Sequence, residues 1–373
     1  MMDNAKAVFR FPFQRPDFPA REQWVPFLDE SYARHWFSNS GPLVRQLEAM
    51  TSAAIGRPCL AVSSGTMAIQ LALLALDKAP GPVILPSFTF AGTLSAVVAA
   101  GYEPVLADVD ENQWELGVAQ LEAIVEGMGI RPCAVVAVRT FGQCSDYSPL
   151  EQWCRAHGIA LILDSAGAFG GSLANGQPVG GQGIAECFSL HATKVFCAGE
   201  GGLLCGAPEL MERARKACNF GLSDGGIDRV GTNGKMSEFT AAVALAQFPR
   251  VTAAVKARRE WAERYIRTFS KVAPEWRHTA APEHTVFQAF PVLAPDAQRR
   301  ADAEIRLRER GVQTRRYYHP ALHETEAAQG VRRAKDLSVS SALASRMLCL
   351  PMYSRYSDIE VEEMDSILRS VAW

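Results

Sequence analysis

Apolar runs alternate with helical patterns between residues 45 and 245, and this alternation limits the fold more than any other feature of the 373-residue chain. The apolar runs lie at 59–62, 83–85, 105–107, 134–138 and 159–164. Strands that are separated by helices are typical of parallel sheets, because a parallel connection must cross over one face of the sheet. The sequence therefore predicts an α/β fold with a mostly parallel central sheet covered by helices.

The remaining chain divides into an arm and a smaller C-terminal part. Residues 1–40 are predicted to form an N-terminal arm, since Phe9, Phe11, Phe13 and Phe18 alternate with polar residues and prolines in a way that does not suit a helix. We expect the arm to pack against the body or a second subunit. Residues 41–250 are predicted to form a large α/β domain, and 251–373 a small α+β domain. In the small domain the patterns predict strands at 284–293 and 312–318, and helices at 301–310 and 356–371.

Composition excludes several classes of function. The formal net charge is -2 and no block of like charges occurs, so nothing indicates a nucleic-acid-binding protein. No apolar run approaches the length of a membrane helix, and the N-terminus lacks the apolar core of a signal peptide. The nine cysteines show no Cys-x-x-Cys pair and no metal spacing, and an odd number suits a reducing compartment. We expect a cytoplasmic protein without a metal site.

Two residues at the predicted strand ends suggest a specific chemistry. Asp164 ends the apolar run 159–164, and Lys194 follows the run 187–190 within a loop of small and apolar residues. Ligands of open α/β sheets bind beyond the carboxyl ends of the strands. Pyridoxal phosphate needs an amine for a Schiff base and an anion beside its pyridine nitrogen. Lysine is rarely buried without a partner, so a solvated loop lysine is the competing interpretation of Lys194 alone.

A third stretch offers a phosphate site. Ser64, Gly65 and Thr66 open an apolar helix that runs to about residue 76. The start of a helix presents free N–H groups and the positive end of the helix dipole, which together favour a phosphate. An ordinary Ser/Thr N-cap is the alternative. Phe90, which precedes the next helix, could stack on a flat ring or simply belong to the core.

In order and spacing, these stretches resemble the DegT-type sugar aminotransferases, a branch of the fold-type-I pyridoxal-phosphate enzymes, over nearly the whole chain. The resemblance rests on the following segments: Gly41-Pro42, Ser64-Gly65-Thr66, Pro86 to Phe90, Asp164, Phe188 to Gly202 with Lys194, Asn233 to Glu238, and Leu350 to Tyr353. It implies a ping-pong transfer of an amino group, with L-glutamate as the expected donor, to a keto sugar that is expected to be linked to a nucleotide.

The resemblance also implies roles for individual residues. Lys194 would form the Schiff base and shuttle protons, and Asp164 would pair with the pyridine nitrogen. The residues that would hold the rest of the cofactor are Ser64, Gly65, Thr66 and Ser189 at the phosphate and Phe90 on the ring. Asn233 would reach the phosphate of the neighbouring subunit's cofactor, so the resemblance implies a homodimer with shared active sites.

Two positions depart from the family pattern. The family commonly carries a glutamine or histidine three residues after the aspartate, where it contacts the hydroxyl side of the cofactor ring, and this chain has Gly167 there. The family's Asn-Tyr-Arg is here Asn233-Gly234-Lys235, which removes an aromatic ring and replaces a planar guanidinium with a flexible ammonium. Both changes could reshape the substrate pocket.

Candidate substrate contacts are His191, Lys235, Tyr317 and His319. The last two belong to a cluster at 315–319, at most half of which can face a cleft if it is a strand. Three other functions stay open from the residues. The first is amination of a cyclitol or natural-product ketone. The second is a sugar dehydratase, which Lys194 argues against because such relatives usually carry histidine there. The third is a regulator that binds pyridoxal phosphate without turnover.

Overall fold

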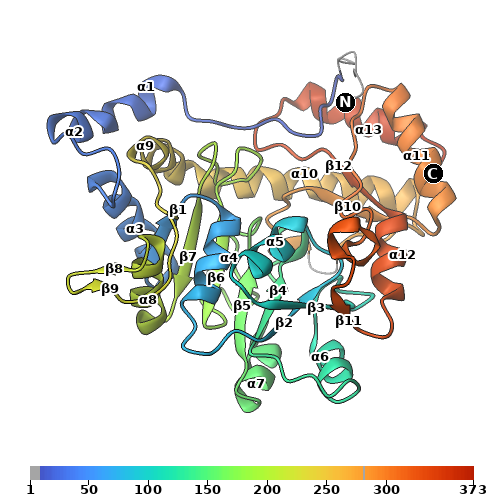
Figure 1. The fold of residues 1–373 in the computed structure, drawn as a ribbon. Coiled ribbons are helices and arrows are strands. Elements are labelled where there is room, and N and C mark those ends of the chain that lie inside the picture. The colour runs from blue at the N-terminus through green and yellow to red at the C-terminus, as the bar shows by residue number, and fades with distance from the viewer. Residues whose placement is uncertain (1–8, 280–281) are drawn as a thin grey trace.

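The computed structural model describes residues 9–279 and 282–373, and a central sheet organises them (Figure 1). The strand order is β1-β7-β6-β5-β4-β2-β3-β11. The strands are β1 (Cys59–Val62), β2 (Pro82–Pro86), β3 (Glu103–Ala107), β4 (Ala134–Val138), β5 (Ala160–Asp164), β6 (Ala185–Ser189), β7 (Gly202–Gly206) and β11 (Arg332–Arg333). All neighbours pair in parallel except β7, which is antiparallel to both β1 and β6. The predicted mostly parallel α/β sheet is confirmed.

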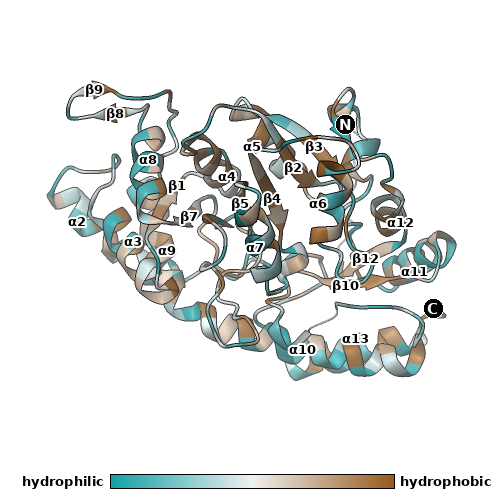
Figure 2. Cartoon of the chain, turned by 90° about the horizontal axis from the view of Figure 1, so that it is seen from below, coloured by the Kyte–Doolittle hydropathy of each residue, from teal (hydrophilic) through white to brown (hydrophobic). Residues whose placement is uncertain are grey.

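Helices cover both faces because successive side chains of each strand point to opposite sides. Leu60 and Val62 of β1 join a core with α4, α5 and α8, whereas Cys59 and Ala61 join a core with α3 and α9. Helices α6 and α7 cover β2 to β5 on the same side as α3 and α9. Figure 2 shows that the central strands are hydrophobic and that the polar residues gather on the outer helices. The helices are α3 (Pro42–Ile55), α4 (Gly65–Leu74), α5 (Ala91–Ala99), α6 (Val118–Val125), α7 (Ser148–Ala156), α8 (Pro208–Cys218) and α9 (Glu238–Gln247).

The C-terminal part has a separate core of aromatic and aliphatic side chains. It is built by α10 (Val251–Val272), α11 (Ala297–Glu309), α13 (Asp358–Ser370) and the antiparallel pair β10 (Phe290–Leu293) and β12 (Met347–Leu350). The part is also tied to the large sheet. Strand β11 pairs with β3, and the Asp108 carboxylate accepts the backbone N–H groups of Val339 and Ser340 at the start of α12 (Ser338–Arg346).

One predicted strand of this part is shorter than expected, and a second is wrong. The strand predicted at 284–293 is confined to β10, because the segment before it is a 3-10 turn and an irregular stretch that bonds to residues 141 and 142. The strand predicted at 312–318 is not a strand. Two of its residues meet two different segments through single bridges, Val312 with Phe11 and Arg315 with Cys349, so no ladder forms.

The arm is extended over residues 9–20 and then forms two short helices, α1 (Arg21–Trp24) and α2 (Leu28–Ala33). The first eight residues of the predicted arm lie outside the described residues. Phe11 is fully buried in the C-terminal core and exchanges backbone hydrogen bonds with Gly311 and Gln313. Figure 1 shows the arm running from there along the molecule to α1.

A small hairpin, β8 (Leu222–Ser223) and β9 (Gly226–Ile227), projects from the edge of the molecule beside α8 (Figure 1). It occupies the first half of the glycine-rich loop 221–235. Within residues 9–279 and 282–373, no helix combines the length and the apolar character needed to cross a bilayer.

Candidate active site

A cavity of about 500 Å³, here called the lysine cavity, opens where three parallel strands end. The last residues of β4, β5 and β6 all line it, namely Val138, Asp164 and Ser189. Its other walls come from the start of α4, the start of α5, the loop between β6 and β7, and C-terminal residues near 288 and 315–318. This is the edge at which parallel α/β sheets bind ligands.

Lys194 and Asp164 face this cavity with opposite electrostatic perturbations. Burial lowers the pKa of the Lys194 ammonium, and Asp164 partly offsets that effect. Burial raises the pKa of Asp164, while hydrogen bonds from Thr93 and the Ala166 backbone oppose it. A group that is buried next to a specific charged partner in a cleft is a candidate for chemistry. The pair matches the amine and the anion that the sequence predicts.

The loop that carries Lys194 is held by its own backbone. Leu190 donates to Gly201, Ala192 to Gly199, and Lys194 to the carbonyl of His191. His191 Nδ1 lies 2.9 Å from Thr193 Oγ1. These bonds fix the loop between two antiparallel strands, so the amine has a defined place at the cavity wall.

The start of α4 forms an anion cradle next to Ser189. The Ser64 hydroxyl accepts the backbone N–H of Met67 at 3.0 Å, so the N-cap interpretation is correct for that side chain. The N–H groups of Gly65 and Thr66, in the first turn of the helix, remain available to a ligand. A Cβ at position 65 would stand 2.8 Å from the Ser189 Cβ. Only glycine lets the helix start approach Ser189 so closely.

Phe90 lies at the mouth of the lysine cavity with 63% of its surface exposed. Large aromatic residues are normally buried in the core, so this exposure argues against the core interpretation. Phe90 is the N-cap of α5, whose residue Gly92 packs close to Thr66. An aromatic face is thus offered next to the anion cradle.

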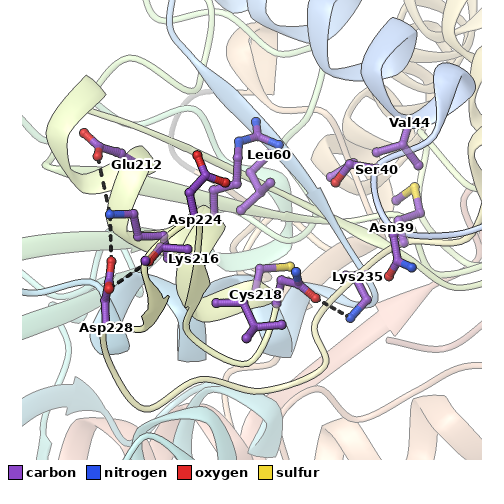
Figure 3. Close-up of a pocket in the computed structure, with 17 residues that line it drawn as sticks. Asn39, Ser40, Val44, Leu60, Glu212, Lys216, Cys218, Asp224, Asp228 and Lys235 are labelled. Carbon is purple, nitrogen blue, oxygen red and sulfur yellow. Dashed lines mark hydrogen bonds and ion pairs between the residues drawn. The ribbon is translucent and has the colours of Figure 1, made fainter.

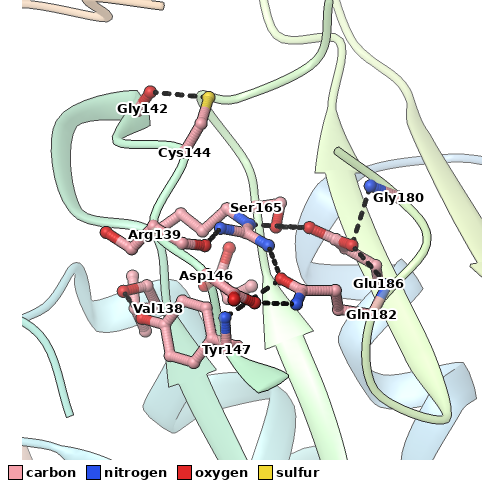
Figure 4. A network of polar contacts seen from close by, with 12 residues as sticks. Val138, Arg139, Gly142, Cys144, Asp146, Tyr147, Ser165, Gly180, Gln182 and Glu186 are labelled. Carbon is pink, nitrogen blue, oxygen red and sulfur yellow. Dashed lines mark hydrogen bonds and ion pairs between the residues drawn. The ribbon is translucent and has the colours of Figure 1, made fainter. Parts of the chain in front are cut away.

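A buried polar network supports the turns behind the cavity (Figure 4). Arg139 directly follows β4, and its Nε donates to Glu186 Oε1 at 2.8 Å with both side chains fully buried. Its Nη2 donates to Gln182 at 2.9 Å, and its backbone N–H donates to the Asp164 carbonyl. Removing one partner would leave an unpaired buried charge. The network therefore fixes the segment after β4 relative to Asp164.

Burial also raises the pKa of Glu115 to about 7. Its carboxylate accepts the Thr140 N–H at 3.0 Å, close to the same turn.

The predicted site residues fall into two groups. The lysine cavity brings together Ser64, Gly65, Thr66, Phe90, Asp164, Ser189, Lys194, His191 and Tyr317. Asn233, Lys235 and His319 do not line it. Asn233 and His319 are exposed. The backbone of Lys235 bridges to Val62 close to the start of α4, but its side chain donates to Asn219 Oδ1 at 2.9 Å and lines a different cavity. The roles of all twelve residues remain predictions.

Thr93 and Gln288 are two cavity residues that sequence reasoning missed. Thr93 donates to Asp164 Oδ2 at 2.8 Å from one turn inside α5, and it is 1% exposed. Its spacing of three residues from Phe90 could have indicated the same helix face. Arg315 was noted only as part of the cluster at 315–319. Gln288 lies in a segment that was predicted as strand, and no signal in the sequence marked it.

A second cavity of about 550 Å³, here called the hairpin cavity, lies between α8, the β8–β9 hairpin and the segment at 39–44 (Figure 3). Several of its charged side chains already have ion-pair or hydrogen-bond partners. Lys216 Nζ lies 3.1 Å from Asp228 and 3.8 Å from Glu212, and Lys235 donates to Asn219. It holds Lys235 but none of the cofactor candidates.

Comparison with known proteins gives consistent matches over the whole chain. The model of the DegT/DnrJ/EryC1/StrS aminotransferase family matches residues 21–371. The chain is 28% identical over 369 residues to the dTDP-4-amino-4,6-dideoxy-D-glucose transaminase of Shigella dysenteriae, covering 96% of this chain and 98% of the relative.

It is 30% identical over 337 residues to the UDP-N-acetyl-3-dehydro-alpha-D-glucosamine 3-aminotransferase of Acidithiobacillus ferrooxidans, covering 88% and 87%. The crystal structure of DesI in the presence of its TDP-sugar product superimposes with a TM-score of 0.86 at 32% identity, covering 97% of this chain and 93% of DesI.

Proposed function

We propose that this pyridoxal-phosphate-dependent aminotransferase acts on a keto sugar attached to a nucleoside diphosphate. The premise is that the chain belongs to the DegT/DnrJ/EryC1/StrS aminotransferase family. L-Glutamate is the proposed amino donor. Three relatives support a nucleotide-linked sugar as the substrate. Two are named for a dTDP-linked and a UDP-linked sugar, and the third, DesI, was crystallised in the presence of its TDP-sugar product. The observation that carries the proposal is the lysine cavity, where Lys194 and Asp164 lie with opposite pKa shifts.

The donor set of this cavity fits the cofactor. Glycine at position 65 opens the space in which two helix N–H groups can meet a phosphate, because a Cβ there would collide with Ser189. Asp164 offers a buried carboxylate to a ring nitrogen, and Lys194 offers an amine to an aldehyde. Pyridoxal phosphate, when bound, supplies an electron sink for the carbon that loses or gains the amino group.

Lys194 performs the proton transfers in this proposal. Its lowered pKa increases the fraction of neutral amine near pH 7, and only the neutral amine can attack a carbonyl or accept a proton. Its place at the cavity wall lets Nζ take a proton from one carbon and return it to another as general base and then general acid. The backbone hydrogen bonds of the loop hold the amine at one wall of the cavity, from which it would deliver a proton to one face of a bound cofactor.

Asp164 keeps a cationic partner charged. A buried carboxylate is costly unless a positive group neutralises it, and a protonated ring nitrogen would return its pKa toward the ordinary range. Thr93 holds Oδ2 in place from α5. Thr93 and the Ala166 N–H thus hold the Asp164 carboxylate in place as a hydrogen-bond acceptor.

We further propose a homodimer in which Asn233 completes the partner's site. Asn233 is exposed and lies outside its own subunit's lysine cavity. It shares the surface with large apolar side chains that solvent reaches in the single chain: Phe220 at 50%, Leu222 at 45%, Ile227 at 75% and Val230 at 83%. An exposed apolar patch of this kind is typical of an interaction surface.

A cytoplasmic location is also proposed, and it rests on the cysteine content.

The first experiment is an absorbance measurement on the purified protein with pyridoxal phosphate, before and after L-glutamate is added without a ketone. We expect a visible band of the lysine-bound cofactor, which glutamate converts to the near-ultraviolet band of the aminated cofactor. A visible band that glutamate leaves unchanged would contradict the donor, and the absence of any visible band would contradict the assignment of Lys194. A panel of nucleotide-linked keto sugars then identifies the acceptor.

A further inference from the structure

Two cysteines face each other at one edge of the central sheet. Strands β1 and β7 are antiparallel neighbours (Figure 1), and their register pairs Cys59 directly with Cys205. The two sulfur atoms lie 2.8 Å apart. Among the residues that the structure describes, no other two cysteine side chains share a hydrogen bond. The contact therefore distinguishes one pair among the nine cysteines of the chain.

The hydrogen bonds of the ladder show how close the two backbones come. Opposite residues of an antiparallel pair alternate between hydrogen-bonded positions and non-hydrogen-bonded positions, and the latter have Cα atoms about 4.5 Å apart. Gly206 donates to the Pro58 carbonyl, so the position next to the cysteines is a hydrogen-bonded one. The Cys59 N–H points away from β7 and donates to the Ser52 hydroxyl. Cys59 and Cys205 thus occupy a non-hydrogen-bonded position, where the separation of about 4.5 Å is one that a disulfide can span.

The surroundings give the two thiols different roles. The hydrogen bond from the Cys205 thiol lowers the pKa of Cys59, whereas burial raises the pKa of Cys205. The thiolate is the form that attacks an oxidant, so Cys59 should react first and Cys205 second. Cys59 is 4% exposed and Cys205 is fully buried, which limits the oxidant to a molecule as small as hydrogen peroxide.

We propose that Cys59 and Cys205 are a site of oxidative modification, at which a peroxide converts the two thiols to a disulfide that fastens β1 to β7. The Cys59 thiolate attacks one peroxide oxygen, which becomes the oxygen of a sulfenic acid, and the other oxygen leaves as hydroxide. The Cys205 sulfur then attacks the Cys59 sulfur, the S–O bond breaks, and water leaves after proton transfer. In total, two thiols and one hydrogen peroxide give one disulfide and two water molecules.

The place of the bond indicates what it does. Cys59 and Cys205 are 146 residues apart in the chain, and a bond that closes a long loop restricts the unfolded chain strongly. Neither cysteine lines the lysine cavity, and the opposite end of the ladder, where Val62 pairs with Gly202, lies next to that cavity's helix start. The bond should therefore stabilise the edge of the sheet. In a reducing compartment the pair stays as two thiols, and the bond forms only under oxidative conditions.

The test treats the purified full-length protein with hydrogen peroxide, removes the peroxide with catalase and blocks the remaining thiols with N-ethylmaleimide. Peptide mapping without reductant then shows which cysteines are joined. We expect the peptides of Cys59 and Cys205 to be linked, with a mass two hydrogens below their sum, and dithiothreitol to separate them. We also expect the oxidised protein to melt about 5 °C above the reduced protein.

Cys59→Ala and Cys154→Ala are matched variants. Each removes one buried sulfur, but Cys154 belongs to α7 and to a different part of the core. Cys154→Ala should keep the linked peptides and the rise in melting temperature, whereas Cys59→Ala should lose both. Each variant is compared with its own reduced form, so a general loss of stability does not affect the result. Cys205→Ala removes the second thiol and should leave Cys59 as a sulfenic acid that dimedone labels.

The remaining outcomes would overturn the inference. Recovery of Cys59 and Cys205 as N-ethylmaleimide adducts, or of Cys59 as a sulfinic acid, would show that the pair does not close. A bond from either residue to another cysteine would show that the register of β1 and β7 does not determine the pairing. A linked protein that melts at the temperature of the reduced form would contradict the stabilising role. None of these measurements depends on the proposed aminotransferase reaction.

Discussion

The lysine cavity and the hairpin cavity differ little in volume, about 500 and 550 Å³, but greatly in their electrostatics. In the hairpin cavity the carboxylate of Asp228 has a lowered pKa, because Ser223 and Lys216 bond to its charged form. In the lysine cavity the pKa values of Asp164 and Lys194 are shifted toward the neutral forms by burial. Volume alone would favour the hairpin cavity over the lysine cavity as the candidate active site.

The comparison shows that charged groups whose partners are present differ electrostatically from charged groups whose partners are incomplete. Charges that satisfy each other stabilise a surface and leave nothing for a ligand. Charges and polar atoms whose partners are incomplete store an unfavourable free energy that a ligand can release. Lys194 and Asp164 of the lysine cavity belong to the second kind.

The largest expected difference is between two lysines. Lys194→Ala should abolish the visible cofactor band and lower kcat by at least about 10³-fold, because it removes both the nucleophile and the proton carrier. Lys216→Ala, the control in the hairpin cavity, loses only surface ion pairs and should keep its activity within about twofold, with at most about 1 kcal/mol of stability lost. Equal effects of the two variants would remove the distinction between the cavities.

Asp164→Asn should have the next largest effect. The amide keeps the shape but cannot stabilise a cationic ring nitrogen, so we expect kcat to fall by about 10² to 10³-fold. Single-turnover absorbance with L-glutamate measures the half-reaction directly. Retention of the full rate would mean that another group holds the charge.

Glu115 extends the comparison to stability. Its folded pKa of about 7 exceeds the ordinary value of 4.5, so the folded state keeps a proton that the unfolded state loses. The free energy of unfolding should therefore fall as pH rises from about 4.5 to 7, by at most about 3 kcal/mol from this group. Urea unfolding of the wild type and Glu115→Gln at several pH values isolates the contribution. The variant should show a flatter profile, and identical profiles would contradict the buried acid.

Thr93→Val should have the smallest effect of the series. It keeps the side-chain volume and removes the hydrogen bond to Asp164 Oδ2, so we expect the glutamate half-reaction to slow by about tenfold. Thr93→Ser should recover most of the rate, because it restores the hydroxyl. A Ser variant as slow as the Val variant would indicate a packing role for this position.

The strands of the large sheet and the residues at their ends could be predicted, because both depend on local patterns. Apolar runs identify β4 and β5, and the position directly after such a run identifies Asp164. The segment 312–318 could not be predicted, since its bridges to Phe11 and Cys349 depend on residues far away in the chain.

Gln288 was missed for a related reason. Gln288 lines the lysine cavity and packs against Gly167, which lies over a hundred residues earlier and comes into contact only in the folded chain. The sequence marks position 167 as a departure from the family pattern, but it contains no local signal that names the residue filling the gap.

The backbone hydrogen bonds of Phe11 with Gly311 and Gln313 determine when the arm can fold during translation. The backbone groups that the arm needs are translated about 300 residues after the arm itself, roughly 15 to 60 s later at typical elongation rates. Until then Phe11 has no C-terminal core to pack into. The arm is therefore secured only after residues 311–313 have been made, and nascent chains halted before residue 311 should present the apolar residues of the arm to chaperones.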